Sequence, residues 1–247
     1  MDLRFIYRGF KARYRDQRLE IKNLLKNLKQ DSIAIDVGSN KGSYLWSLSK
    51  EVPLGRVIAF EPQPILAKYL VNACIKTNLK NVLVENYGVS SKSGVFSLAI
   101  PGKNLTSPGA SFEKAVFERE NCKFIKIKTI TLDNYFKSEK KHIGALKIDV
   151  EGHEMSVLIG AKKIINLHKP IILCESEQRH LTKGKVKDVL NFIEALGYDG
   201  YLIAKDSLIP VKDFLPDIHQ KQVGERYWDN PDYFNNFIFK PKVLSND

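Results

Sequence analysis

Asp36-Val37-Gly38-Ser39-Asn40-Lys41-Gly42 joins the end of a short apolar run, Ile33 to Val37, to a helix that the pattern predicts at about 43–50. Glycine at position 38 permits a turn that a side chain would obstruct, and glycine at position 42 lets the start of the helix lie close to a ligand. Open α/β sheets bind ligands just beyond the carboxyl ends of their strands. The stretch therefore predicts an α/β fold with a ligand site at its first turn.

Apolar runs and helical stretches alternate along the rest of the chain. Further runs lie at 57–60, 82–89, 145–150 and 171–174, and predicted helices lie at about 65–77, 154–167 and 185–196. This alternation is typical of parallel strands joined by crossover helices. The last two runs, 198–204 and 237–239, have no helix between them and predict an antiparallel edge. We predict a doubly wound, mostly parallel sheet of seven strands.

Two segments interrupt this alternation. Residues 94–100 and 124–130 resemble strands that flank an insertion near 101–123, whose early Gly, Pro, Asn and Ser content predicts a loop. The second irregular segment lies near 206–236. Long excursions from a compact domain are more often functional covers than accidents. We therefore predict one domain over 31–247 with two functional insertions.

The first thirty residues are strongly basic, with nine Arg and Lys against three acids, and they hold six of the eleven net positive charges. Apolar residues recur there at helical spacing and predict a basic amphipathic helix over 1–30 that packs on the domain. A solvated helix face is the favoured interpretation of this charge, and binding to an anionic membrane surface or an acidic partner is the alternative. Nucleic acid would be attracted by the same field, but the sequence contains no recognisable RNA-binding module.

Composition limits the class of protein. The 247 residues are 43% hydrophobic, which is enough for one sizeable core. The sequence shows neither a membrane span of roughly 18 apolar residues nor the apolar run of a secretory signal. Its three cysteines form no C-x-x-C pair, so a disulfide framework or a zinc ribbon is not indicated. We expect a soluble, cytoplasmic protein.

The first turn also indicates the cofactor. Its G-x-x-x-G spacing differs from the G-x-G-x-x-G of dinucleotide sites, and the Asp36 carboxylate suits a ligand that has an ammonium group and a sulfonium but no phosphate. S-adenosylmethionine fits that description. Glu61 ends the next strand, where an acid accepts hydrogen bonds from ribose hydroxyls, and Asn86 follows the third strand, where it would contact adenine. The predicted cofactor-binding residues are Asp36, Gly38, Ser39, Asn40, Gly42, Glu61, Pro62 and Asn86.

Four segments together resemble the successive motifs of FkbM-type methyltransferases. They are Asp36-Val37-Gly38-Ser39-Asn40-Lys41-Gly42, Phe60-Glu61-Pro62, Thr131-Leu132-Asp133 and Lys147-Ile148-Asp149-Val150-Glu151-Gly152-His153-Glu154. The similarity covers about 33–177 and is most specific around 149–154. It implies a class I methyltransferase fold and transfer of methyl groups to oxygen, often on sugars, glycans or polyketide-type products. The basic segment and the residues after 206 lie outside the resemblance.

Candidate catalytic residues follow the fourth and fifth strands of the predicted parallel sheet. An alcohol oxygen is a poor nucleophile near neutral pH, so a positioned base would assist methyl transfer. Asp149 is the first choice, because a charge that closes a buried strand is costly unless it is used or paired. Helix electrostatics explain Glu154 without a catalytic role. The predicted catalytic residues are Asp149, Glu151, His153, Glu175 and His180.

Several alternatives stay open at this point. A divalent metal held by Asp149, Glu151, His153 and Glu175 is a minority hypothesis, since no spacing is diagnostic of one. The expected acceptor is a glycan, a lipid-linked sugar or a secondary metabolite. The competing functions are an RNA or protein methyltransferase and a catalytically inactive cofactor-binding partner subunit, and a homo-oligomer is compatible with either. The aromatic residues at 226–234 suit stacking on a sugar as well as core packing.

Overall fold

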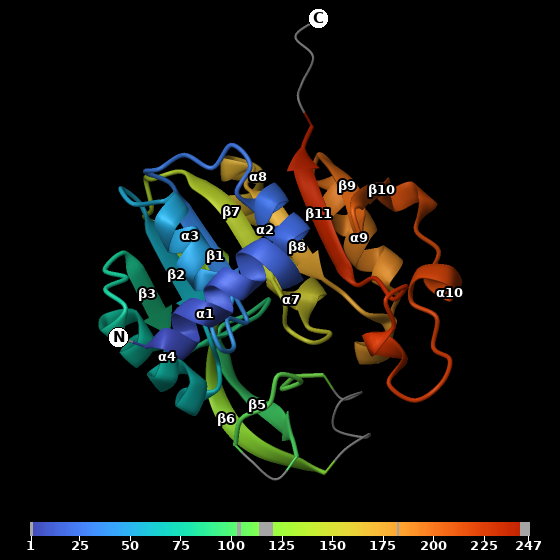
Figure 1. Cartoon of the computed structure of the whole chain (residues 1–247), viewed down its shortest axis with the longest axis horizontal. Helices are drawn as coiled ribbons and strands as arrows, with labels where there is room; N and C mark the ends of the chain where they lie inside the picture. The colour runs from blue at the N-terminus through green and yellow to red at the C-terminus, as the bar shows by residue number, and fades with distance from the viewer. Residues whose placement is uncertain (1, 103–104, 114–120, 182, 243–247) are drawn as a thin grey trace, which may run out of the picture.

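The computed structural model describes residues 2–102, 105–113, 121–181 and 183–242, so 103–104 and 114–120 of the first predicted insertion lie outside the described residues. The main sheet has the strand order β10-β9-β11-β8-β7-β1-β2-β3 (Figure 1). Its strands are β1 (Ile33–Val37), β2 (Arg56–Phe60), β3 (Val82–Glu85), β7 (Ile143–Ile148), β8 (Ile171–Glu175), β9 (Tyr198–Ala204), β10 (Ser207–Pro210) and β11 (Asn236–Pro241).

The five strands from β3 to β8 pair in parallel, and β11 pairs antiparallel with both β8 and β9. The predicted doubly wound class I architecture and its antiparallel end are therefore confirmed. The predicted count of seven strands is wrong, because the sheet has eight. The additional strand is β10, which folds back on β9 after a tight turn in which Lys205 has a φ of 46°. Sequence inspection had assigned these residues to an irregular segment.

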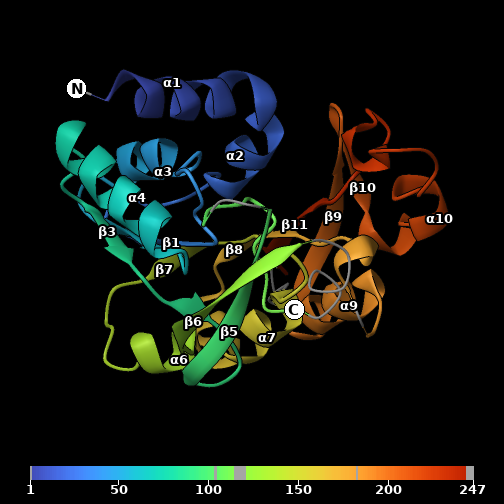
Figure 2. The same ribbon diagram turned by 90° about the horizontal axis from the view of Figure 1, so that it is seen from below.

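Helices cover both faces of the sheet (Figure 2). One layer contains α1 (Leu3–Lys11), α2 (Arg18–Leu24), α3 (Leu45–Glu51) and α4 (Pro64–Lys76). The other layer contains α7 (Glu154–Ile159), α8 (Lys162–His168) and α9 (Val186–Ala195), with the short α6 (Leu132–Tyr135) beside it. The C-terminal segment adds α10 (Pro216–His219) and 3-10 turns at 178–180, 211–213 and 227–229. Each layer packs its own apolar cluster against the sheet.

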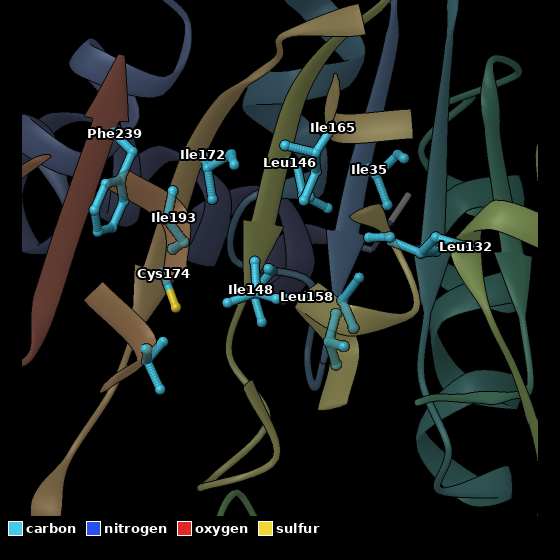
Figure 3. Close-up of a cluster of buried hydrophobic side chains, with 14 of the residues drawn as sticks. Ile35, Leu132, Leu146, Ile148, Leu158, Ile165, Ile172, Cys174, Ile193 and Phe239 are labelled. Carbon is cyan, nitrogen blue, oxygen red and sulfur yellow. The ribbon is translucent and has the colours of Figure 1, made fainter. Parts of the chain in front are cut away.

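The cluster beneath α7, α8 and α9 forms the larger core (Figure 3). Ile35, Leu146 and Ile172 project from neighbouring strands into it, and Ile165 and Ile193 meet them from the helices. These strands are buried on both faces, which explains their nearly continuous apolar sequence. A sheet fixed in this way gives the loops at its carboxyl edge a rigid base.

The helix predicted at 154–167 is divided into α7 and α8. A side chain at Gly160 would place its Cβ 2.2 Å from the carbonyl oxygen of Ser90, so the chain passes too closely there for any other residue. The Asp133 carboxylate then accepts hydrogen bonds from the amides of Lys163 and Ile164 and caps the first turn of α8. The resemblance segment around Asp133 thus has a structural role in joining α6 to α8.

The run predicted at 82–89 also divides, because Gly88–Val89 (β4) leaves the main sheet. β4 pairs with β6 (Cys122–Ile130), and β6 pairs antiparallel with β5 (Gly94–Pro101), so the first insertion rises from a separate three-stranded sheet (Figure 1). The two strands predicted at 94–100 and 124–130 correspond to β5 and β6. This small sheet stands against the carboxyl edge of the main one.

The basic N-terminal segment is not the single helix that was predicted. A π-helical turn at Ala12–Asp16 follows α1, and the chain bends at Gln17 before α2 begins. Phe5 and Ala12 are buried in the cluster that α3 and α4 share with the sheet, so the segment is part of the domain core. No helix in the described part of the chain is both long and apolar enough to span a membrane.

Candidate active site

A cavity of about 250 Å³ opens at the carboxyl ends of β1, β2 and β7. The main sheet contributes one wall, which includes Gly38, Asn40, Glu61, Asp149, Glu151 and Glu175. The first insertion and the turn before it contribute the facing wall, which includes Tyr87, Leu98, Pro108, Ala110, Ser111 and Phe112. The cavity therefore brings residues predicted to bind cofactor together with residues predicted to be catalytic.

Glu61 organises the loop that follows β1. Its carboxylate accepts hydrogen bonds from the backbone amides of Asn40, at 2.7 Å, and Gln63, at 2.9 Å. Asn40 has a φ of 46°, a left-handed conformation that asparagine tolerates better than most residues. Burial raises the pKa of Glu61 to about 7, although the two amides oppose this shift. A carboxylate has about four acceptor sites, so Glu61 retains capacity for the two hydroxyls of a ribose.

Asn86 and Pro62 support the end of β2. The Asn86 amide donates hydrogen bonds to the carbonyl oxygens of Glu61 and Pro62, at 2.9 and 3.0 Å. Pro62 lines the cavity, whereas Asn86 does not, and the neighbouring Tyr87 lies in its place. In this structure the Asn86 side chain therefore holds the backbone after β2 and does not line the cavity.

The two glycines of the first turn are required by different neighbours. A Cβ at Gly38 would lie 1.8 Å from the carbonyl oxygen of Asp149, so glycine lets β1 and β7 meet at the cavity. A Cβ at Gly42 would lie 2.7 Å from the Phe5 ring, so the close approach there is to α1 and not to a ligand, contrary to the prediction. Ser39 is buried and its hydroxyl donates to the carbonyl of Asp36, outside the cavity wall.

Lys147 is a buried cation beside the cavity that the sequence analysis does not single out. Its ammonium lies 3.1 Å from Asp36 Oδ1 and 3.3 Å from Asp149 Oδ2, and it donates a hydrogen bond to the carbonyl of Gly38 at 2.8 Å. Burial alone would lower the pKa of Lys147, but the carboxylates of Asp36 and Asp149 raise it above its ordinary value. Asp36 thus does not line the cavity. It is linked through Lys147 to Asp149, which does.

The far end of the cavity is acidic. Glu175 accepts a hydrogen bond from the Asn235 amide at 2.7 Å, and Glu151 Oε2 lies 3.0 Å from His180 Nδ1. Burial, followed by the charge of Asp149, raises the pKa of both Glu151 and Glu175 well above the usual glutamate value. Such groups hold a proton at higher pH than an exposed glutamate does.

The sequence model of the methyltransferase FkbM domain matches residues 36–199, which include every described residue that lines this cavity. The chain belongs to the FkbM methyltransferase family. This confirms the resemblance noted in the sequence, and the fold is that of class I S-adenosylmethionine-dependent methyltransferases.

Two curated relatives match the FkbM domain. The hexuronic acid methyltransferase AglP of Haloferax volcanii is 34% identical over 157 residues, which cover 60% of this chain and 59% of that protein. The methyltransferase sdnD of Sordaria araneosa is 27% identical over 162 residues, which cover 55% of this chain and 62% of that protein. The matched part therefore spans about three fifths of each relative.

A solved structure shows the same fold. The methyltransferase FkbM of Methylobacillus flagellatus superposes with a TM-score of 0.54 at 18% identity, over 86% of this chain and 44% of that one. At this identity the similarity establishes the fold and not the acceptor.

Hydrogen bonds connect the first insertion to two sides of the cavity in the FkbM domain. Gln63 exchanges two hydrogen bonds with the backbone of Ser107, at 2.9 and 3.0 Å. On the other side, the Ser111 hydroxyl donates to the carbonyl of Glu151 at 2.6 Å. The described part of the insertion thus covers the cavity. It contacts Gln63, near Glu61, on one side and Glu151 on the other.

The FkbM domain does not bring His153 to the cavity. The imidazole lies within hydrogen-bond distance of Ser90 Oγ, at 2.9 Å, and of Glu113 Oε1, at 2.8 Å, and packs against the Phe112 ring. His180 is also buried outside the cavity wall, where it holds Glu151. Both histidines therefore lie next to residues of the cavity wall, Phe112 and Glu151, and outside the wall itself. The sequence does not reveal these positions, because His180 contacts a residue 29 positions away, Glu151, and His153 contacts one 63 positions away, Ser90.

The segment at 226–234, which is rich in aromatic residues, contacts the acidic end of the cavity through Glu177. Arg179 and the Tyr233 hydroxyl both donate hydrogen bonds to Glu177, and the Arg179 guanidinium lies 4.8 Å from the centre of the half-exposed Trp228 ring. Tyr233 is buried, so this part of the loop packs on the domain. Among the described residues, no group of three or more His, Cys, Asp or Glu has the arrangement of a metal site.

Proposed function

We propose that the protein transfers the methyl group of S-adenosylmethionine to a hydroxyl oxygen of a glycan, a lipid-linked sugar or a related hydroxylated metabolite. The observation that carries the proposal is the cavity in which the Glu61 loop and the partly buried acids Glu151 and Glu175 meet. Membership of the FkbM family supports methyl transfer. The name of the AglP relative, a hexuronic acid methyltransferase, supports a sugar-like acceptor.

The described residues fit the cofactor. Glu61 would hold the ribose, and the apolar groups of Phe60, Val89 and Leu98 would enclose the adenine. The acidic end provides carboxylates for the ammonium and for the positive sulfur. When bound, S-adenosylmethionine supplies a methyl group that is already activated for in-line displacement, so the protein chiefly has to align an acceptor oxygen with it.

Glu175 is the residue that we assign as general base. It is partly buried, it lines the cavity, and the Asn235 amide fixes its orientation. In its ionised form it takes the proton of the acceptor hydroxyl as the oxygen attacks the methyl carbon. Asp149 is already bound to Lys147, so we assign it to orientation of the acceptor, and Glu151 shares the binding of that group.

The acceptor group is expected to be uncharged. A carboxylate or phosphate beside the reacting hydroxyl would face the carboxyl groups of Asp149, Glu151 and Glu175 and be repelled by those that are ionised. The nearby cations do not offset this, because Lys147 is bound to Asp36 and Asp149, and Arg179 is bound to Glu177. A neutral sugar hydroxyl therefore suits the site better than a hexuronic acid.

The experiment measures release of S-adenosylhomocysteine with a panel of neutral sugars, uronic acids, lipid-linked sugars and hydroxylated metabolites. Glu175→Gln should lower kcat by about 10²- to 10⁴-fold, the usual contribution of a positioned base, while cofactor affinity stays within a few-fold. Asp31→Asn, an exposed acid that is distant from the cavity, is the matched control and should leave kcat unchanged.

Two results would contradict the proposal. Full activity of Glu175→Gln would remove its assigned role as base. Cofactor binding by the wild-type protein without transfer to any acceptor of the panel would favour an inactive partner subunit, and transfer to RNA or protein alone would move the acceptor to another class.

A further inference from the structure

Helix α1 and the turn after it expose a row of large apolar side chains. Leu3, Tyr7, Phe10 and Tyr14 are 69%, 63%, 52% and 56% exposed, and their spacing of four, three and four residues puts them on one face. The Phe10 and Tyr14 rings contact each other, with centroids 4.5 Å apart. The opposite face carries the buried Phe5 and packs on the domain. We call the four exposed residues the aromatic stripe.

A basic groove continues from the end of this stripe. Tyr14 forms part of its lining together with the cations Arg13, Arg18, Lys22, Lys26 and Lys240. Among the described residues that line it, Glu51 is the only acid, and it lies 3.7 Å from Arg13. Burial, followed by the positive charge of Lys26, lowers the pKa of Lys240, and both residues line the groove.

We propose that the aromatic stripe and the basic groove bind the surface of an anionic phospholipid bilayer, with α1 lying in the plane of the headgroups. Amphipathic helices bind such surfaces by inserting Tyr, Phe and Leu side chains to the depth of the acyl boundary while adjacent Lys and Arg side chains contact the phosphates. An apolar row beside a cluster of cations is complementary to that interface. A soluble acidic partner would need only the cations and would leave the stripe in water.

The surface is held rigidly to the domain. Phe5 packs against Gly42 beneath the stripe, and the Arg8 guanidinium donates hydrogen bonds to the carbonyl of Lys41 and the hydroxyl of Tyr69, both at 3.1 Å. Lys41 and Gly42 belong to the loop that contributes Asn40 to the cavity. The helix therefore binds as part of the domain, in the layer that also contains α3 and α4 (Figure 2). This inference does not rest on the proposed function.

The test is flotation of the full chain with vesicles of phosphatidylcholine alone or mixed with phosphatidylglycerol. We expect the wild-type protein to bind the mixed vesicles at least about tenfold more tightly, and added salt to weaken that binding. Tyr7→Ser/Phe10→Ser and Lys22→Glu/Lys26→Glu should each lower the affinity by about tenfold or more. All four positions are exposed, and unchanged melting curves would show that both variants fold.

Matched controls lie on the opposite layer of the molecule. Leu167→Ser removes an apolar side chain that is exposed on α8, and Lys163→Glu/Lys187→Glu reverses two exposed charges on α8 and α9. Both controls should bind the mixed vesicles like the wild type. The proposal is overturned by equal binding to both vesicles, by controls as weak as the stripe variants, or by a dimer that needs Tyr7 and Phe10 without any vesicle binding. Binding to poly-uridine RNA without vesicle binding would overturn it as well.

Discussion

At the scale of single residues, Glu61 is a carboxylate that must lose a proton to be a strong acceptor. Burial raises its pKa to about 7, and hydroxyl donors bind a charged carboxylate more strongly than a neutral one. Affinity for S-adenosylhomocysteine should therefore increase as the pH rises through 7. Glu61→Gln should weaken binding by about 10- to 100-fold and abolish this dependence. Calorimetry at pH 6 and pH 8 measures both effects, and an unchanged pH dependence in the variant would contradict the assignment.

The residues of the site were predictable where the backbone alone decides their position. Glu61, Asp149 and Glu175 stand at the ends of parallel strands, and the apolar runs of the sequence are sufficient to locate those ends. The direction of a side chain, in contrast, depends on its neighbours in the folded structure. His153 turns away from the cavity because Ser90 and Glu113 offer it hydrogen-bond partners, and no spacing in the sequence reveals such distant neighbours.

Lys147 was within reach of sequence reasoning but was not selected. It interrupts an apolar run that forms a fully buried strand, and the parallel register of β1 and β7 puts it beside Asp36. A buried lysine normally requires an acidic partner. The sequence shows the lysine, but it does not show the alignment of β1 with β7 that pairs Lys147 with Asp36.

At the scale of the elements, the turn after β1 depends on its contact with the loop after β7. Gly38→Ala would combine a left-handed backbone with a Cβ 1.8 Å from the Asp149 carbonyl, whereas Gly224→Ala has a similar φ of 87° and open space around it. The Gly38 variant should lose at least about 1 kcal/mol more unfolding free energy than the Gly224 variant, which carries backbone strain alone. Urea denaturation of the two proteins provides the comparison, and equal losses would show that the contact is unimportant.

Elements were predictable from apolar runs, and the errors arose where a distant segment intervenes. The strands β1, β2, β7 and β8 were located closely because buried parallel strands are apolar along most of their length. The division of the helix at Gly160 depends on the Ser90 carbonyl, which the local sequence does not contain. The departure of β4 from the main sheet likewise depends on its pairing with β6, about forty residues later in the chain.

At the scale of the whole molecule, buried acids make stability dependent on pH. Burial raises the pKa of Glu154 to about 8 from an ordinary value of 4.5, so the folded protein retains a proton that the unfolded chain releases. Stability from this group is complete below pH 4.5 and is lost as the pH rises toward 8. Glu154→Gln keeps the acceptor for the Gly152 amide and should remove this loss.

The Gln variant and the wild type should therefore have similar urea midpoints at pH 5 and diverge by pH 8, where the variant is more stable. The difference should approach a few kcal/mol, since each pKa unit corresponds to about 1.4 kcal/mol. Glu225→Gln, at an exposed position, is the control and should follow the wild type. A difference between Glu154→Gln and the wild type that is equal at the two pH values would contradict the burial argument.

The place of β11 in the sheet constrains how the chain is made. β11 lies between β8 and β9 although it follows both in the sequence, so the parallel half and the β9-β10 ribbon share no strand pairing until residues 236–241 have left the ribosome. During that interval β8 presents an open edge, and open edges invite association with neighbouring chains. Until β11 is made, the open edge of β8 is exposed to aggregation, and a chaperone that shields this edge would act in that interval.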